Sequence, residues 1–256
     1  MKNLRIIILA AGKGTRMKSA IPKILHEIYG RPLIDYVREA LPGAGSARVC
    51  VVAGYRQEMV RRHMGPGATC VIQKRLLGTA DAVRCARPFL RGYRGDVLVL
   101  CGDTPLLRKE TVRKLIRLHR RAGAACTFLT TVVSDSSGYG RVVRDSSGSV
   151  AAIREEIDAD DTQKAIAEIN AGVYCFQSRS LYPALAAVPL NAKKKEFYLT
   201  DIMEILVRQG KRIATVRAQD ADEGLGVNSR EDLAYCAAVI RRRILQRLMR
   251  RGGDYH

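Results

Sequence analysis

The sequence has few of the residues that mark several common classes of protein. Its 256 residues include no tryptophan and only four phenylalanines, so few large aromatic rings are available for stacking on nucleic-acid bases. Its four histidines are scattered and form neither a metal-ligand pattern nor a catalytic triad pattern. No apolar run approaches the roughly 20 residues that a membrane-spanning helix needs. These absences argue against a metal site or catalytic triad built on histidine and against a membrane-spanning protein.

Signs of secretion and of disulfide bonding are also lacking. The seven cysteines are odd in number, include no C-x-x-C pair and lie mostly in apolar runs such as residues 49–52. Buried, reduced thiols are therefore the simplest interpretation. The apolar run that starts at Leu4 is short and enters a charged loop, unlike a signal peptide. We expect a soluble, cytoplasmic protein.

Positive charge is what the sequence has in excess. Lys and Arg number 44 against 25 Asp and Glu, which gives a formal net charge of +19. This balance favours polyanionic partners such as nucleotides, nucleic acid or an anionic membrane surface, but it does not choose among them. A solvated basic surface without a ligand explains the charge equally well.

Strand-like and helix-like segments alternate through the first half of the chain. This alternation predicts an α/β fold with a doubly wound, mostly parallel, Rossmann-like sheet. Residues 134–176 are richer in turns, and we expect them to form loops and hairpins over the sheet edge. The predicted strands are 4–9, 48–53, 69–72, 96–101, 125–133, 141–144, 150–153, 169–176 and 212–216. The predicted helices are 32–41, 56–64, 79–89, 109–122 and 201–209.

The segment 8–17 is the most informative part of the chain. An apolar run ends there in a loop that contains Gly12, Gly14 and the cationic Arg16. A strand that runs directly into a basic, glycine-containing loop presents backbone N–H groups to phosphates. The loop lacks the complete dinucleotide-binding and Walker A patterns. On its own it therefore indicates only an enzyme that handles nucleotides.

A basic amphipathic helix is predicted after Ser229, which can cap it. Its apolar stripe consists of Leu233, Ala237, Ile240, Ile244 and Leu248. Its other face carries Arg241, Arg242, Arg243, Arg247, Arg250 and Arg251. Such a helix can bind a membrane surface, a partner protein or RNA, or it can pack on its own domain with a solvated arginine face. We divide the chain into a domain of residues 1–228 and this helix, residues 229–256.

Several separated motifs together point to one family. The opening L-A-A-G-K-G-T-R-M is followed by Pro22-Lys23 and then by further motifs in a fixed order. These are Gln73 with Leu77-Gly78-Thr79, Leu100-Cys101-Gly102-Asp103-Thr104-Pro105-Leu106, Gly138-Tyr139-Gly140-Arg141, Ile153-Arg154-Glu155, Glu168-Ile169-Asn170-Ala171-Gly172, Glu196-Phe197-Tyr198-Leu199-Thr200-Asp201 and Gly226-Val227-Asn228.

From residue 6 to about residue 230 the chain resembles the sugar-phosphate nucleotidyltransferases. Among them it is most similar to the uridylyltransferase half of the bifunctional N-acetylglucosamine-1-phosphate uridylyltransferase/glucosamine-1-phosphate acetyltransferase family. The resemblance implies a GT-A-like nucleotidyltransferase fold. It also implies a Mg²⁺-dependent reaction of UTP with N-acetylglucosamine 1-phosphate that gives UDP-N-acetylglucosamine and pyrophosphate.

The physical difficulty of that reaction is the repulsion between two anions. A phosphate dianion must approach the α-phosphorus of a triphosphate, so the site must supply positive charge and in-line positioning. No acid or base is required, because the attacking oxygen is already ionised near neutral pH.

The resemblance assigns a role to each matching residue. Lys23 would stabilise charge at the α-phosphate, and Arg16 would contact the leaving pyrophosphate. The implied nucleotide-binding residues are Leu9, Ala10, Ala11, Gly12, Gly14, Gln73, Gly78 and Thr79. The implied sugar-phosphate-binding residues are Gly140, Glu155, Asn170, Tyr198 and Thr200, and the implied Mg²⁺ ligands are Asp103 and Asn228.

The chain departs from the family pattern at three places. The long acetyltransferase domain of hexapeptide repeats is absent, so we expect no acetyl transfer. Asp81 stands where the family usually has histidine, and Lys74 and Arg75 make the nucleotide-pocket loop unusually basic. These changes could alter base preference, so the same chemistry with another nucleotide or sugar phosphate is an alternative. A second alternative is a basic nucleic-acid-binding protein on this fold.

Overall fold

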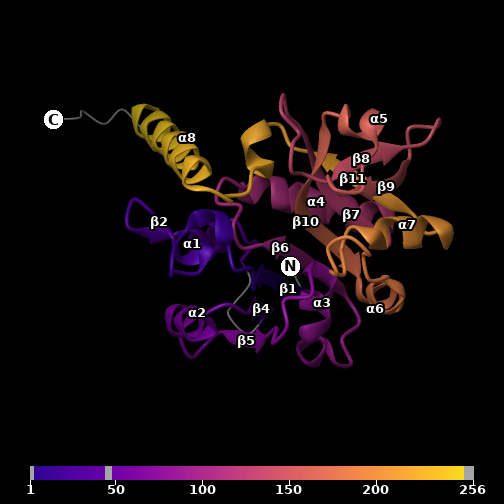
Figure 1. Cartoon of the computed structure of the whole chain (residues 1–256), viewed down its shortest axis with the longest axis horizontal. Helices are drawn as coiled ribbons and strands as arrows, with labels where there is room; N and C mark the ends of the chain where they lie inside the picture. Colours follow the sequence, from indigo (N-terminus) through magenta and orange to yellow (C-terminus); the bar gives the residue numbers. More distant parts are fainter. Residues whose placement is uncertain (1–2, 44–47, 251–256) are drawn as a thin grey trace.

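A computed structural model describes residues 3–43 and 48–250 of the chain (Figure 1). The strands are β1 (Leu4–Ala10), β2 (Glu27–Ile28), β3 (Arg31–Pro32), β4 (Val49–Ala53), β5 (Thr69–Ile72), β6 (Asp96–Cys101), β7 (Cys126–Val132), β8 (Arg141–Arg144), β9 (Val150–Arg154), β10 (Glu168–Gln177) and β11 (Ile213–Arg217). The α-helices are α1 (Leu33–Glu39), α2 (Gln57–Met64), α3 (Thr79–Cys85), α4 (Lys109–Ala122), α5 (Asp161–Lys164), α6 (Ser178–Ala187), α7 (Asp201–Arg208) and α8 (Arg230–Met249). Short 3₁₀ turns include η1 (Thr15–Met17), η2 (Lys23–Leu25), η4 (Pro88–Leu90) and η5 (Ala221–Gly224).

The main sheet is mixed, but most of its strands run in one direction. Its order is β11–β7–β10–β6–β1–β4–β5, with β8 and β9 joined to it through β10. β1 pairs in parallel with both β4 and β6, and β10 is antiparallel to its neighbours β6 and β7. The sheet therefore extends in both directions from β1, which confirms the predicted doubly wound α/β fold.

One expectation about the sheet was wrong. The segment 169–176 does not lie among loops over the sheet edge but forms β10, between β6 and β7. Its residues Val173, Cys175 and Phe176 are fully buried, as a strand covered on both faces requires. Only β8 and β9 form the expected hairpin outside the central strands.

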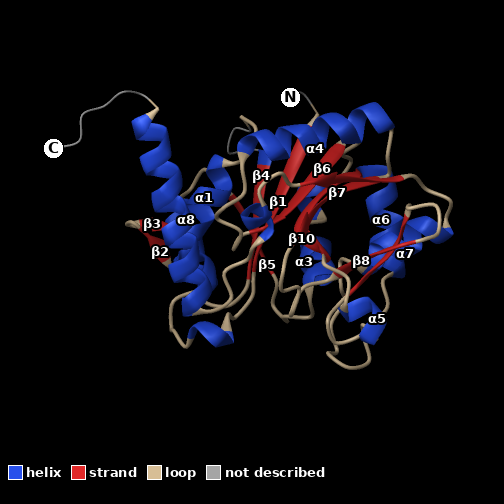
Figure 2. Cartoon of the chain, turned by 90° about the horizontal axis from the view of Figure 1, so that it is seen from above, coloured by secondary structure: helices blue, strands red, loops and turns tan. Residues whose placement is uncertain are grey.

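Successive strand residues enter two cores on opposite faces of the sheet. Ile6 and Ile8 lie in the core that α1, α2 and α4 cover. Ile7 and Val99 lie in the core that α3, α6 and α7 cover. Figure 2 shows α4 along one side of the sheet and α3 on the other. Both faces of the sheet are thus covered by apolar side chains. Polar residues that bind a ligand are therefore expected at the ends of the strands.

Two helices differ from the prediction for reasons involving proline. α3 ends at Cys85 rather than at residue 89, because Pro88 begins the 3₁₀ turn η4 and cannot donate a helical hydrogen bond. α6 was not predicted, and it contains Pro183 in its interior. Burial of Leu181 and Leu185 holds α6 against the sheet in spite of that proline.

The last helix packs on the rest of the chain through its first half. Ser229 forms a capping box with Asp232, as the sequence predicted for the cap. Val239 and Ile240 are buried against residues of the opening segments and of the loop after β6. Figure 1 shows the C-terminal end of α8 projecting from the body. Arg251 lies outside the described residues, and the domain boundary at residue 228 stays a prediction.

Across residues 3–43 and 48–250, no helix is both long and apolar enough to cross a membrane.

Candidate active site

The opening loop and Asp103 lie together because their strands are neighbours. Leu9 of β1 is paired in register with Cys101 of β6. Just beyond them, Gly102 N donates to Leu9 O at 2.8 Å. The carboxyl ends of these parallel strands therefore bring the phosphate-binding candidate and the metal-binding candidate to one edge of the sheet.

Lys23 joins this edge through a close contact with Gly14. The φ of Gly14 is +60°, and a Cβ atom there would lie 2.8 Å from Lys23 Cβ. Glycine therefore permits both the left-handed turn and the approach of the lysine. Arg16 follows on the exposed turn η1, and its side chain makes no hydrogen bond or ion pair to another described residue.

At the centre of the site, Lys23 bridges the two predicted metal ligands. Its Nζ forms an ion pair with Asp103 and donates to Asn228 Oδ1 at 3.0 Å. Asn228 is held there partly by the backbone, because Val227 N donates to Asp103 O at 2.8 Å. The two side-chain oxygens thus converge on one point, which an ammonium group occupies.

The donor atoms at this point suit the predicted cation. A carboxylate and an amide oxygen are the hard ligands that Mg²⁺ takes, with phosphates and water completing its shell. Among the described residues, no group of three or more His, Cys, Asp or Glu could hold a metal ion. A cation between Asp103 and Asn228 would therefore need most of its ligands from substrate and water.

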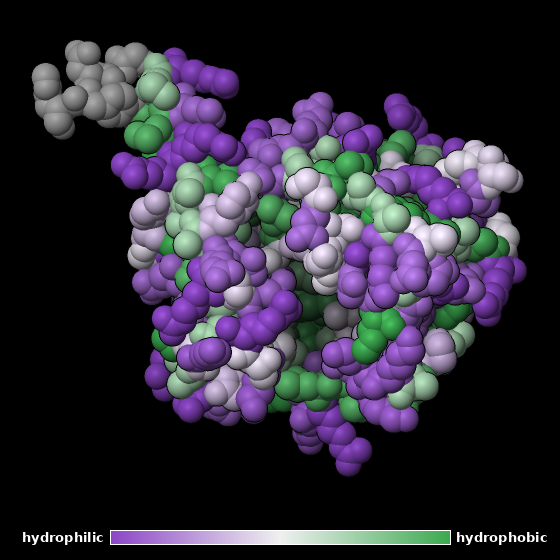
Figure 3. Space-filling view, turned by 45° about the horizontal axis from the view of Figure 1, so that its top comes forward, coloured by the Kyte–Doolittle hydropathy of each residue, from purple (hydrophilic) through white to green (hydrophobic). Residues whose placement is uncertain are grey.

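A cavity of about 200 Å³ lies beside the Asp103–Asn228 pair. Figure 3 shows the molecule hollowed near its middle, between the half that carries α8 and the opposite half. The cavity brings together the predicted residues Leu9, Thr79, Asp103, Gly140, Glu155, Asn170, Thr200 and Asn228. Its lining does not include the predicted residues Ala10, Ala11, Gly12, Gly14, Arg16, Lys23, Gln73, Gly78 and Tyr198.

A larger cavity lies elsewhere. It measures about 1130 Å³ and opens beside Asp96, at the start of β6 and thus at the opposite sheet edge. Its described lining contains none of the predicted site residues, so its size does not make it the candidate site.

Hydrogen-bonding side chains are fixed in place on one wall of the smaller cavity. Thr200 Oγ1 donates to Glu155 Oε1 at 2.7 Å. Asn170 Nδ2 donates to the Tyr174 hydroxyl at 2.6 Å, and Asn170 Oδ1 accepts from Gly172 N at 3.2 Å. Burial raises the pKa of Glu155. The wall thus presents fixed and partly desolvated hydrogen-bonding groups to the cavity.

The neighbouring carboxylates Glu155 and Glu156 have different tasks. Glu156 pairs with the buried Arg141 and accepts from Gly138 N at 3.0 Å, so it organises the loop before β8. Glu155 instead lines the cavity, and so does Tyr139, to which sequence reasoning gave no role. Tyr139 lies between Gly138 and Gly140, and this glycine-flanked position is the sequence signal that could have marked it as a candidate site residue.

Among the predicted nucleotide-binding residues, Gln73 has an amide with a fixed orientation. Gln73 is 4% exposed, and its Nε2 donates to Gly78 O at 3.0 Å and to Asp81 Oδ2 at 2.8 Å. Neither partner can donate in return, so the amide cannot flip, and Oε1 is the group left for a ligand. Asp81, noted in the sequence only as a departure, is thus a direct partner of Gln73. Lys74 and Arg75 are exposed.

Hydrogen bonds join a segment with predicted nucleotide-binding residues to a segment with predicted sugar-phosphate-binding residues. Phe197 N donates to Leu77 O at 2.7 Å, and Ala80 N donates to Phe197 O at 2.9 Å. Leu199 N donates to Thr79 Oγ1 at 2.9 Å. Tyr198 lies half-buried in this segment, and desolvation raises its pKa. The segments 77–80 and 197–200 therefore behave as one structural unit.

Gly78 lies where the segments 77–80 and 197–200 approach each other closely, so its replacement by a larger residue should destabilise the fold. Its φ is +96°, and a Cβ there would lie 2.6 Å from Phe197 O. Gly78→Ala should lose about 1–3 kcal/mol through backbone strain and about 1–3 kcal/mol more through the steric clash. Urea unfolding measures the loss.

Gly65→Ala is the matched control for this prediction. Gly65 has nearly the same backbone conformation, with φ 74° and ψ 175°, but no atom lies within 4 Å of the Cβ position. It should show the backbone strain alone. Equal losses in the two variants would contradict the packing argument.

Comparisons with known proteins agree with the fold and with the motifs. The chain is 48% identical over 251 residues to the bifunctional protein GlmU of Pelotomaculum thermopropionicum and 40% identical over 252 residues to that of Enterococcus faecalis. Each match covers 98% of this chain and 55% of the relative. The chain thus spans about half the length of the curated relatives it matches.

A solved structure shares the fold. A structure assigned as a glucose-1-phosphate thymidylyltransferase from Bacillus anthracis, in complex with a sucrose, superposes with a TM-score of 0.75 at 18% identity. The superposition covers 93% of this chain and 95% of that one. In sequence, residues 5–226 match the family model described as Nucleotidyl transferase. The chain therefore belongs to the nucleotidyl transferase family and is a nucleotidyltransferase.

Proposed function

We propose that this chain transfers a uridylyl group from UTP to N-acetylglucosamine 1-phosphate, which releases pyrophosphate and forms UDP-N-acetylglucosamine. The observation that carries the proposal is the convergence of Lys23, Asp103 and Asn228 between the phosphate-binding loop and a cavity with polar walls. The choice of substrates follows from the family motifs and from the likeness to the bifunctional proteins named above. A cytoplasmic location stays a prediction.

The chemistry requires positive charge where the two phosphates meet. A sugar-phosphate oxygen attacks the α-phosphorus, and pyrophosphate leaves on the opposite side. Lys23 supplies a cation at the phosphorus under attack, and the exposed guanidinium of Arg16 is available to the departing pyrophosphate. Mg²⁺, held by Asp103 and Asn228, would neutralise phosphate charge when bound.

The remaining residues position the two substrates. The backbone from Leu9 to Gly12 and Gly14 faces the nucleotide, with Gln73, Gly78 and Thr79 at the base and ribose. Across the cavity, Glu155 accepts hydrogen bonds from sugar hydroxyls beside Asn170. Holding both substrates in line removes much of the entropic barrier to their reaction. Gly140, Tyr198 and Thr200 complete the proposed sugar-phosphate subsite.

A substrate panel tests the proposal. Four nucleoside triphosphates are each combined with several sugar 1-phosphates, and pyrophosphate release is measured with and without Mg²⁺. We expect turnover to be fastest for UTP with N-acetylglucosamine 1-phosphate and to require a divalent cation. Turnover of another pair without turnover of this one would overturn the choice of substrates and favour the alternative of related chemistry.

Lys23→Ala separates catalysis from cation binding. We expect the variant to lose about 3 kcal/mol of transition-state stabilisation, or roughly 10²-fold in kcat. Its Mg²⁺ half-saturation should not rise, because removal of the ammonium leaves Asp103 unpaired. Lys114→Ala removes the same charge from the exposed face of α4 and serves as the control. A wild-type kcat in Lys23→Ala would show that another cation carries the chemistry.

Asp81→Asn tests how the base is selected. Gln73 presents Oε1, so it accepts from the N3–H of uracil and repels cytosine, whose N3 is itself an acceptor. Loss of the Asp81 carboxylate weakens the constraint on the amide, and the UTP-to-CTP ratio of kcat/KM should fall roughly tenfold. The KM for the sugar phosphate should stay constant. Asp161→Asn, on the exposed start of α5, is the control, and an unchanged ratio in Asp81→Asn would refute this account.

A further inference from the structure

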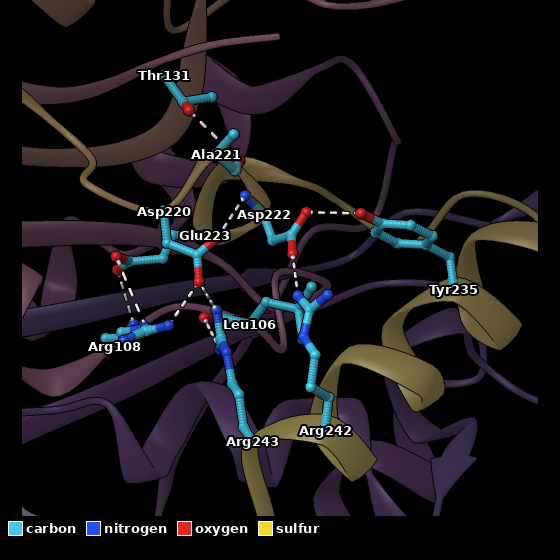
Figure 4. Close-up of polar contacts among 10 residues, drawn as sticks. All are labelled: Leu106, Arg108, Thr131, Asp220, Ala221, Asp222, Glu223, Tyr235, Arg242 and Arg243. Carbon is cyan, nitrogen blue, oxygen red and sulfur yellow. Dashed lines mark hydrogen bonds and ion pairs between the residues drawn. The ribbon is translucent and has the colours of Figure 1, made fainter. Parts of the chain in front are cut away.

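A polar network joins α8 to the loop that follows β6 and to the loop that contains η5 (Figure 4). Arg243 of α8 reaches both loops, because its Nη1 donates to Leu106 O at 2.6 Å and its Nη2 to Asp220 Oδ2 at 2.8 Å. Arg108 pairs with the same Asp220 carboxylate, and Arg108 N donates to Glu223 Oε2 at 3.1 Å. One guanidinium of α8 thus ties together two loops that are distant in the sequence.

Further contacts attach η5 to α8. The Tyr235 hydroxyl donates to Asp222 Oδ1 at 2.7 Å, and Arg242 Nη2 donates to Asp222 Oδ2 at 3.2 Å. Glu223 is 1% exposed, and burial raises the pKa of its carboxyl group. The acidic residues of this segment therefore all meet hydrogen-bond donors or cations of α8 or of the loop after β6.

The same two loops carry the proposed cation ligands. Leu106 lies three residues after Asp103, and the η5 segment leads directly to Asn228. α8 also holds Asn228 through its own first turn, since Asp232 Oδ2 accepts from both Asn228 N and Ser229 N at 2.8 Å. Asn228 is thus fixed directly by the first turn of α8, whereas the loop of Asp103 is attached to the helix three residues further on, at Leu106.

Arg243 does not belong to the solvated arginine face that the sequence predicted. Its side chain is 23% exposed, against 60% for Arg242. A guanidinium carries its donors on separate nitrogens of a rigid fork, so it holds the Asp220 carboxylate and the Leu106 carbonyl in one fixed geometry, whereas the ammonium of a lysine donates from a single nitrogen. Its position between the loops explains why an arginine is placed there.

We propose that Arg243 is a positioning residue for the Asp103–Asn228 pair, so that α8 sets the affinity of the site for its divalent cation. The proposal rests on the proposed function, in which that pair holds Mg²⁺. Groups that orient metal ligands typically change metal affinity by roughly 10- to 100-fold when they are removed. The family model covers residues 5–226, so α8 lies beyond the segment that defines the family.

The test compares Arg243→Ala, Arg243→Lys and Arg247→Ala in the full chain. Arg247 is exposed on the same helix, and its removal changes the net charge equally. We expect Arg243→Ala to raise the Mg²⁺ half-saturation roughly tenfold or more, with the KM for N-acetylglucosamine 1-phosphate unchanged. Arg243→Lys should recover part of the affinity, and Arg247→Ala should match the wild type.

Hydrogen exchange of the metal-free chain supplies a readout that does not depend on activity. Amides of residues 103–108 and 220–228 should exchange faster in Arg243→Ala than in Arg247→Ala, while those of β1 and β4 stay protected. Equal Mg²⁺ half-saturation and equal exchange in the two alanine variants would overturn the proposal. A wild-type chain with no Mg²⁺-dependent turnover would instead overturn the proposed function.

Discussion

The contact of the Lys23 ammonium with the oxygens of Asp103 and Asn228 is the interaction on which the rest of the site depends. It joins three loops that are 80 and 205 residues apart in the sequence. The pairing of β1 with β6 places the first two loops, and the last helix places the third. The junction holds the Lys23 ammonium, the Asp103 carboxylate and the Asn228 amide within direct contact of one another, so these three groups form the polar centre of the site.

Arginine has a second task in this chain, which is to satisfy backbone carbonyls. Arg84 donates to Leu185 O and Val188 O, Arg141 to Tyr139 O, and Arg243 to Leu106 O. Each of these carbonyls lies in a loop or at a helix end, where no regular ladder supplies a donor. Part of the net charge of +19 is therefore structural. These arginines are occupied within the protein, which weakens the case for a nucleic-acid-binding role.

The sequence predicted most accurately those elements whose bounds depend on a local pattern of apolar and polar residues. β6 and α4 have the predicted bounds, because an apolar strand and an amphipathic helix each have a recognisable period. The central position of β10 could not be predicted, because an apolar run indicates a buried strand but does not determine its neighbours in the sheet. The partner of Asp81 and the inward direction of Arg243 depend on tertiary contacts for the same reason. The family motifs named residues of the cavity wall, and one of them contains Tyr139, whereas the place of Tyr174 in the wall became visible only in three dimensions.

The backbone bonds between the segments 77–80 and 197–200 have a consequence for the kinetics. One segment belongs to the proposed nucleotide half-site and the other to the sugar-phosphate half-site, and they share hydrogen bonds through Phe197 and Leu199. A displacement of either segment would therefore strain hydrogen bonds that the other segment shares. Under the proposed function, the substrate that binds first would thus act on the segment that lines the pocket of the second.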